Sequence, residues 1–290
     1  MIADHGNECH CNKFLPGLLS GDKIGCSANT EPNVGSSASE IQTSAYLDGD
    51  SWVINGTKTF ITNGEFADYV SVAVQFDRSK GSKGIGMILV DRNETSFESK
   101  RIHLLGLKGG DLAELAELHF DDLRVPKENL IVPPGEGYKH KMVGFHTWRC
   151  FVAVHANSIA EKALEHSLKY VKERQQFGKP IGSFQLIQKL LADMKTDLDI
   201  SKLLAYRALD MVTKGKNSRL ESSMAKQFAT EMAVRVTSNA IQIHGAYGLT
   251  TEFPLERLYR NAKILTIPEG TSQIQKLIMG RELTGMSAFK

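Results

Sequence analysis

The sequence lacks the features that would place it outside ordinary globular proteins. It has four cysteines in 290 residues, too few for a disulfide scaffold and in keeping with a reducing compartment. Its 35 basic and 33 acidic residues leave a net charge of +2, which argues against a mainly electrostatic nucleic-acid binder. Its longest apolar runs fall far short of the roughly 20 residues that span a bilayer, and no apolar leader follows a charged start. We therefore expect no membrane segment and no secretion signal.

One short cluster near the start combines residue types that bind metals. His5, Cys9, His10 and Cys11 lie within seven positions, but zinc sites usually join two close ligands to a distant second pair. No second pair is present in the sequence, so we predict no metal site.

What is present divides the chain by periodicity. Residues 23–134 are predicted to form β structure, because short runs rich in β-branched and aromatic residues alternate with turn signals. The expected strands cover residues 51–55, 58–62, 69–74 and 86–90, and the turns fall at Asp48-Gly49, Asn55-Gly56, Asn63-Gly64 and residues 79–84. Asn55-Gly56 predicts a type I′ hairpin, since both central positions of that turn need positive φ. Strands without intervening helices predict an antiparallel barrel or sandwich.

Beyond residue 134 the period becomes helical. Apolar residues at Ile187, Leu190, Leu191, Met194 and Leu198 form one stripe of a helix, and similar stripes run through residues 146–172 and 218–243. Glycine-containing segments at residues 178–180 and 245–248 are predicted to end helices. The fold class is therefore α+β, with a β-barrel or sandwich domain followed by a C-terminal antiparallel four-helix bundle.

Three segments carry candidate chemistry with alternatives that spacing leaves open. Residues 30–37 form a loop of turn formers and hydroxyls that can bind a polar ligand or merely connect. Arg174 closes a helix, where a cation is commonly only a partner of the dipole. Glu269 is either the first residue of a helix or a carboxylate facing an apolar cavity, where desolvation makes it a useful base. No dinucleotide fingerprint or phosphate-binding loop is present.

Together these segments closely resemble the acyl-CoA dehydrogenase family from about residue 14 to residue 284. The resemblance is carried by six motifs in the family's order and spacing, at residues 30–32 (TEP), 55–58 (NGTK), 60–64 (FITNG), 174–180 (RQQFGKP), 242–248 (QIHGAYG) and 267–275 (IPEGTSQIQ). It implies a flavoenzyme with FAD between the β domain and the bundle. A carboxylate removes the α-proton of an acyl-CoA thioester while a hydride passes from the β-carbon to flavin N5, giving a trans-2-enoyl-CoA. Hydrogen bonds to the thioester carbonyl stabilise the developing enolate.

The resemblance also implies a role for individual residues. Glu269 falls on the catalytic base, and Trp148 falls where some members carry an alternative glutamate. The expected substrate contacts are Ser36, Trp148, Arg149 and Gly270. The expected FAD contacts are Asn29, Thr30, Phe60 and Thr62 at the flavin; Arg174, Phe177 and Gln185 reaching a neighbouring subunit's FAD; and Gln242, Gly245, Ala246, Thr271 and Gln273.

Several positions depart from the family's usual residues. Asn33 and Ser37 replace a glycine and an aspartate of the loop, Phe60 stands for tryptophan, Ala246 for glycine and Pro268 for tyrosine. Proline removes a backbone donor at residue 268 and leaves the N–H of Glu269 intact.

The family's first, all-helical domain is mostly missing from the match. We expect residues 1–22 to be its remnant, residues 23–134 the middle β domain and residues 135–290 the helical bundle. Another chain supplies the missing helices, or the chain is a truncated product, or the site is open. An open site would admit water and oxygen to the flavin.

The expected partners are acyl-CoA, an electron-transfer flavoprotein and further copies of the chain in a homo-oligomer, in the bacterial cytoplasm or the mitochondrial matrix. Three alternatives to dehydrogenation stay open: the reverse enoyl-CoA reductase direction, a related oxidase or monooxygenase, and a catalytically weak binding or assembly subunit.

Overall fold

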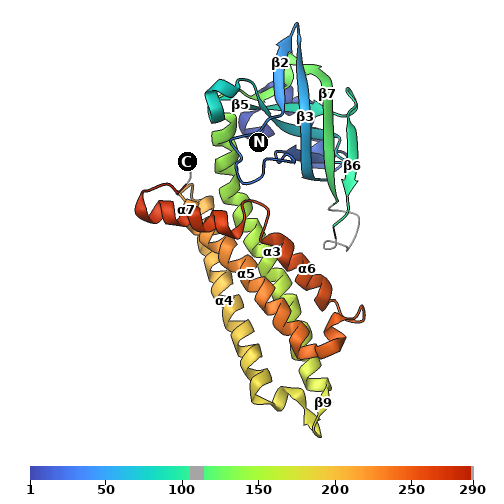
Figure 1. Cartoon of the computed structure of the whole chain (residues 1–290), viewed down its shortest axis with the longest axis vertical. Coiled ribbons are helices and arrows are strands. Elements are labelled where there is room, and N and C mark those ends of the chain that lie inside the picture. The colour runs from blue at the N-terminus through green and yellow to red at the C-terminus, as the bar shows by residue number, and fades with distance from the viewer. Residues whose placement is uncertain (105–113, 289–290) are drawn as a thin grey trace. The chain divides into compact units, whose positions relative to one another are not determined.

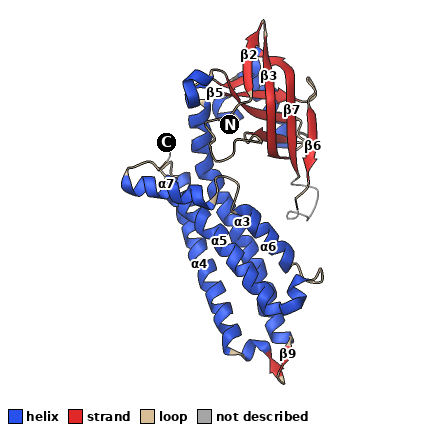
Figure 2. Ribbon diagram, in the orientation of Figure 1, coloured by secondary structure: helices blue, strands red, loops and turns tan. Residues whose placement is uncertain are grey.

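The computed structural model describes residues 1–104 and 114–288. Contacts divide the chain into two compact units, Met1–Met142 and Val143–Lys290. The first unit contains the large sheet, and the second consists mainly of helices (Figures 1 and 2). The change of period near residue 134 thus marks a real change of architecture, and the predicted fold class is confirmed.

The sheet of the first unit has eight strands in the order β6-β7-β3-β2-β4-β5-β8, with β1 added parallel to β4. The strands are β1 (Gly25–Ala28), β2 (Ser44–Asp48), β3 (Ser51–Thr62), β4 (Tyr69–Gln75), β5 (Ile85–Asp91), β6 (Glu98–Ile102), β7 (Leu115–Pro126) and β8 (Leu130–Val132). Short 3₁₀ turns η1 (Arg78–Gly84) and η3 (Lys127–Asn129) join some of them. The sheet is mixed rather than wholly antiparallel as predicted, because β4 pairs in parallel with both β1 and β2. Along this path of strands it does not close into a barrel.

The central strands are buried on both faces. Along β4, alternate residues Val70, Val72 and Val74 enter the main core of the sheet, while Tyr69 on the opposite face joins a second cluster. Helices α1 (Ile2–His5) and α2 (Glu8–Ser20) complete that second cluster, where the ring of Phe14 meets Tyr69 edge-on at 5.0 Å. Because side chains alternate across a strand, burial on both faces favours a mostly apolar strand, and in β4 only Ser71 and Gln75 are polar.

The predicted hairpin at Asn55-Gly56 is wrong. β3 continues through both residues, and the hairpin lies one turn earlier, where Asp48 pairs with Ser51 across the two residues between β2 and β3. Gly56 instead sits at a register shift with φ of 145°, and a Cβ there would approach the Thr43 Cα to 2.7 Å. Glycine is used here for a close backbone approach rather than for a turn.

The second unit is built from long helices. They are α3 (Gly137–Glu173), α4 (Gln185–Thr213), α5 (Arg219–His244), α6 (Leu255–Leu265) and α7 (Ser272–Thr284). α5 packs against α4, α6 and α7, and its buried face is rich in small residues such as Ala225, Ala229 and Ala233. Small side chains let the neighbouring helices approach closely.

The segments predicted to end helices do so. Between α3 and α4 the chain forms a small ribbon of β9 (Gln175–Gln176) and β10 (Lys179–Pro180), followed by η4 (Ile181–Ser183). Its turn consists of Phe177 and Gly178, both with positive φ, as a type I′ turn requires. Between α5 and α6 lies η5 (Gly245–Leu249). Among the described residues, no helix combines the length and apolarity needed to cross a membrane.

One smaller prediction in this unit is wrong. The apolar run 264–268 reads as strand-like in the sequence, but α6 extends to Leu265 and the chain then turns into α7. The helical neighbours of the run, not its own composition, decide its conformation.

Candidate active site

Glu269 lies in the turn between α6 and α7. Thr271 is the N-cap of α7, and its side chain accepts a hydrogen bond from the Ile274 backbone N–H at 3.3 Å. Glu269 therefore precedes the helix, which removes the alternative that it is merely a helix residue. It is half-buried, and its φ of 56° is unusual for a residue other than glycine. Such a conformation persists only where the surroundings hold it.

Three buried side chains hold this turn by its carbonyls. Arg149 Nε donates to the backbone carbonyl oxygen of Glu269 at 3.3 Å. Gln275 Nε2 lies 2.9 Å from the carbonyl oxygens of both Glu269 and Gly270. Lys226 Nζ donates to the Gly270 oxygen at 2.9 Å. Two successive carbonyls thus face the interior of the helical unit, where two cations lie.

The charges around the turn are coupled. Burial lowers the pKa of Arg149 to about 10, and the negative charge of Glu269 opposes that shift. Burial, followed by the positive charge of Arg149, lowers the pKa of Lys226 to about 8, while Glu269 and Glu231 oppose it. The turn thus places the Glu269 side chain in electrostatic interaction with two buried cations. The site can therefore hold a carboxylate base.

The other residues predicted near Glu269 are more exposed. Trp148, next to Arg149 on α3, is 60% exposed, and its ring meets Phe151 edge-on at 5.9 Å. Gln273, in the first turn of α7, is exposed. The helical unit brings Arg149 to the turn that contains Glu269, Gly270 and Thr271.

A second group gathers where α3 ends (Figure 1). The Arg174 guanidinium lies 5.9 Å from the ring of Tyr247 in η5, which brings the 174–180 ribbon beside the turn that follows α5. Phe177 is 92% exposed at the tip of the ribbon. The remaining predicted residues of this group are all exposed: Gln185 at the start of α4, Gln242 at the end of α5, and Gly245 and Ala246 in η5.

The two groups lie far apart within the helical unit. Arg149 and Arg174 are separated by 25 residues along or just beyond α3, which at 1.5 Å per residue is about 37 Å. One extended dinucleotide does not reach from Glu269 to Arg174. The predicted catalytic, substrate-binding and FAD-binding residues of the helical unit thus form two separate clusters.

In the β unit, the loop before β2 is fixed by a buried ion pair. Lys58 Nζ donates to Glu31 Oε1 at 2.8 Å and to the Asn29 carbonyl at 3.2 Å, and Lys58 is fully buried. Glu31 also accepts from the backbone N–H groups of Gln42 and Thr43. Burial raises the pKa of Glu31 but the ion pair and hydrogen bonds outweigh it, so that its pKa is lowered. Burial lowers the pKa of Lys58 to about 8 against the effect of Glu31.

The predicted flavin contacts of this unit lie beside that pair. The Thr59 N–H donates to the Thr30 carbonyl at 2.8 Å, which joins the loop to β3. The pairing of β3 with β7 shifts between Lys58 and Ile61, and Phe60 in this bulge has φ of 56° and is 55% exposed. Bulges often redirect a side chain next to a functional site. Thr62, at the end of β3, and Ser36, in the loop, are both exposed.

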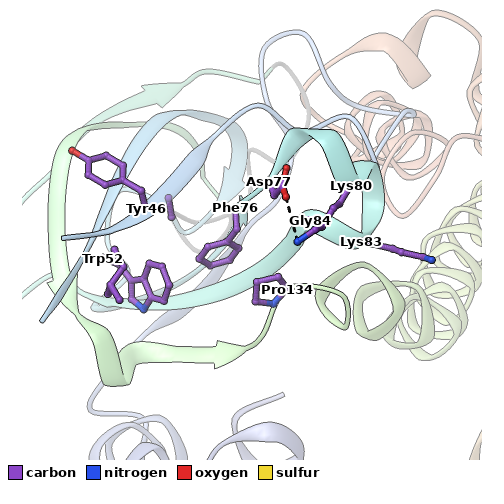
Figure 3. A pocket seen from close by; sticks show the side chains of 10 residues that line it. Tyr46, Trp52, Phe76, Asp77, Lys80, Lys83, Gly84 and Pro134 are labelled. Atoms are coloured by element: carbon purple, nitrogen blue, oxygen red, sulfur yellow. Dashed lines mark ion pairs between the residues drawn. The ribbon is translucent and has the colours of Figure 1, made fainter. Parts of the chain in front are cut away.

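A hollow elsewhere in the β unit contains none of the predicted site residues. It has a volume of about 540 Å³, and its lining includes Tyr46, Trp52, Phe76 and Pro134 (Figure 3). Trp52 and Phe76 meet edge-on at 4.9 Å, and at the rim Lys80 pairs with Asp77. It is an exposed aromatic depression, and nothing in its lining resembles the groups around Glu269.

Comparison with known proteins assigns the β unit and the helical unit to two domains of one family. Residues 26–123 match the family model of the acyl-CoA dehydrogenase middle domain, and residues 135–284 match that of the C-terminal domain. The chain belongs to the acyl-CoA dehydrogenase family.

Individual relatives agree with the family assignment. An acyl-CoA dehydrogenase of Bacillus subtilis is 42% identical over 97% of this chain and 73% of its own length. A subunit of a caffeyl-CoA reductase–Etf complex from Acetobacterium woodii is 38% identical over 94% of this chain and 72% of its own. The structure of butyryl-CoA dehydrogenase from Megasphaera elsdenii superimposes with a TM-score of 0.93 at 39% identity, covering 97% of this chain and 73% of that one.

Acyl-CoA dehydrogenases are FAD-dependent oxidoreductases, and one solved relative is a glutaryl-CoA dehydrogenase with FADH2. The residues of this chain fit such a cofactor. Asn29 Oδ1 is a buried acceptor with no hydrogen-bond partner among the described residues, and a buried acceptor needs a donor such as the ring N–H of a flavin. Gly245, with φ of 60°, has open space where a Cβ would project, so a ligand can approach its backbone.

Sequence reasoning missed the residues that hold the turn at Glu269 and the loop before β2. Lys58 and Lys226 are both fully buried, and Gln275 lies within a quoted motif without having been given a role. A sequence signal was present at Lys226, a lysine in a helical stripe rich in small residues, because buried lysines are rare unless they have a partner.

Proposed function

We propose that this protein catalyses the FAD-dependent α,β-dehydrogenation of an acyl-CoA thioester to the trans-2-enoyl-CoA. The observation that carries the proposal is the turn at Glu269, a half-buried carboxylate directly before a capped helix, whose backbone is held by Arg149, Lys226 and Gln275. Fixed geometry of this kind lets a carboxylate act as a general base without reorganisation.

Each residue of the turn has a defined task in this proposal. The Glu269 carboxylate takes the α-proton, and the Glu269 N–H donates to the thioester carbonyl, which lowers the energy of the developing enolate. Arg149 keeps the base in place through its hydrogen bond to the Glu269 carbonyl. Trp148, Gly270 and Ser36 contact the substrate. Bound FAD supplies the acceptor for the hydride that leaves the β-carbon.

The cofactor contacts are proposed to come from two copies of the chain. The flavin is contacted by Asn29, Thr30, Phe60 and Thr62. Thr271 and Gln273, which come shortly after the base in the sequence, contact the same FAD. Because Arg174 lies about 37 Å along α3 from Arg149, we assign the remaining contacts to the FAD of a neighbouring copy: Arg174, Phe177, Gln185, Gln242, Gly245 and Ala246. A homo-oligomer follows from this assignment.

We further propose an electron-transfer flavoprotein as electron acceptor, which the Etf complex of the Acetobacterium woodii relative supports. That relative is named a reductase, so the enoyl-CoA reductase direction is the second candidate for the same site. The proposed compartment is the bacterial cytoplasm or the mitochondrial matrix. The division into residues 1–22, 23–134 and 135–290, and a separate helical chain as partner, stay predictions.

Replacement of the proposed base tests the function. Glu269→Gln preserves volume but removes the base, so the FAD-loaded variant is expected to keep its flavin while its anaerobic reduction by a panel of acyl-CoA thioesters slows at least about a hundredfold. Rapid-mixing absorbance of the flavin measures the rate. The matched control is Glu252→Gln, a change of an exposed glutamate, which should behave as the wild type. A near-normal rate in Glu269→Gln would exclude Glu269 as the base.

A further inference from the structure

Lys226 is a buried cation outside every motif of the sequence. It lies in the middle of α5 with no exposed surface, and its ammonium donates to the Gly270 carbonyl 44 residues away along the chain. Burying an ammonium is costly unless it is paired and hydrogen-bonded, and this ammonium donates its hydrogen bond to a backbone carbonyl. A lysine at this position therefore points to a role in the turn that it contacts.

The geometry of the turn shows what that role is. Glu269 and Gly270 both have positive φ, at 56° and 88°, and their two carbonyl oxygens face the same buried groups. Arg149 binds the first carbonyl and Lys226 the second, with Gln275 close to both. Without cations on that side, two successive carbonyls pointing inward would lack part of their hydrogen bonding.

We propose that Lys226 is a positioning residue for Glu269, which fixes the Gly270 carbonyl and whose positive charge keeps the neighbouring carboxylate ionised. The inference rests on the proposed function of Glu269 as the base. The lysine acts through the turn and through its charge, without touching the substrate.

The charged groups that act on Lys226 come from three elements. Arg149 on α3 repels its charge, while Glu269 in the turn and Glu231 on α5 itself favour it. The neighbouring side chain from α7 is Gln275, which carries no charge. The coupling between Lys226 and Glu269 is reciprocal. Glu269 favours the protonated form of Lys226, and Lys226 in turn favours the deprotonated form of Glu269.

Three substitutions separate the hydrogen bond from the charge. Lys226→Gln keeps a donor and removes the charge, Lys226→Met removes both, and Lys226→Arg keeps both. Lys195→Met is the matched control, because Lys195 is an exposed lysine of the same helical unit that pairs with Asp199. All four are prepared as FAD-loaded protein.

The primary readout is the titration of the Glu269 carboxylate by ¹³C NMR, with the resonance assigned by its loss in Glu269→Gln. Lys226→Gln and Lys226→Met should raise the titration midpoint by about one pH unit, while Lys226→Arg and Lys195→Met leave it unchanged. The acid side of the pH profile of the flavin reduction rate should move by the same number of pH units. At the pH of maximal rate, Lys226→Met should be at least about tenfold slower than Lys226→Gln.

An unchanged Glu269 midpoint in Lys226→Gln would overturn the proposal. If the neutral variants do not fold, the titration of Lys226 itself in Glu269→Gln decides instead, since loss of the carboxylate should lower the lysine midpoint and an unmoved midpoint contradicts the coupling. A wild-type protein that binds FAD but is reduced by no acyl-CoA would count against the proposed function, while the NMR titration still decides the role of Lys226.

Discussion

At the scale of the residue, the backbone at Glu269 and Gly270 is the most demanding feature of the site. Gly270 has φ of 88°, and a Cβ on it would lie 2.7 Å from Gln275 Nε2, which is one of the groups that hold the turn. Glycine is needed both for its conformation and for the space that Gln275 occupies.

Gly270→Ala should therefore displace the turn. We expect a loss of unfolding free energy of about 1–2 kcal/mol from backbone strain, and at least about a tenfold slower flavin reduction because Gln275 must move. Denaturant unfolding and anaerobic reduction measure the two effects.

The control for this change is Gly280→Ala. Gly280 lies within α7 with open space around it, so alanine should raise stability by up to about 1 kcal/mol and leave the rate unchanged. Equal behaviour of the two variants would show that the Gly270 backbone imposes no special constraint.

At the scale of the element, β3 holds the loop before β2 in place. Lys58 reaches from β3 to Glu31 and to the Asn29 carbonyl, so one side chain links the strand to the residues proposed to contact the flavin. Its pair is enclosed, whereas the pair of Lys127 with Asp50 in the same unit is exposed at 57% and 84%. A buried partner left alone costs far more than an exposed one.

Lys58→Met should lower the unfolding free energy by about 3 kcal/mol near neutral pH, and Lys127→Met by less than about 1 kcal/mol. The folded pKa of Glu31 is below its unfolded value, so its contribution is present above the unfolded pKa and disappears as pH falls through the folded pKa. The difference in unfolding free energy between the wild type and Lys58→Met should accordingly become smaller at acid pH. Urea unfolding at several pH values checks this, and a gap independent of pH would contradict it.

At the scale of the whole molecule, α3 separates two groups of residues that a single cofactor does not join. Arg149 lies beside Glu269, whereas Arg174 lies beside Tyr247. If both groups bind FAD, a second copy of the chain must contribute one of them, and FAD binding must favour assembly by mass action.

Arg174→Ala should therefore weaken FAD retention and assembly together. The FAD-to-protein ratio after gel filtration and the sedimentation coefficient of apo and holo protein are the measurements. Lys172→Ala, an exposed cation in the last turn of α3, is the control and should change neither. Full FAD retention in Arg174→Ala, with apo protein assembling as tightly as holo protein, would disprove the shared site.

The sequence by itself determined the two architectures and singled out the residue proposed as the base. Runs rich in β-branched and aromatic residues predict strands, and helical stripes predict the bundle. The sequence also predicts a helix after residues 269–271, but it leaves open whether Glu269 lies inside or before that helix. These features depend on neighbours within a few residues, where periodicity and capping act. The family motifs include Glu269 of one cluster and Arg174 of the other for the same reason, since each motif is short and local.

Only the tertiary structure decided what surrounds those residues. Asn55-Gly56 has the composition of a hairpin, yet the approach of Thr43 from another part of the chain makes it a bulge in a continuous strand. Lys58 and Lys226 are ordinary charged residues in the sequence. Folding buries them and brings each to a partner that lies 27 or 44 residues away along the chain. Desolvation, which changes the pKa of both lysines, depends on atoms brought together by folding, and no local pattern records it.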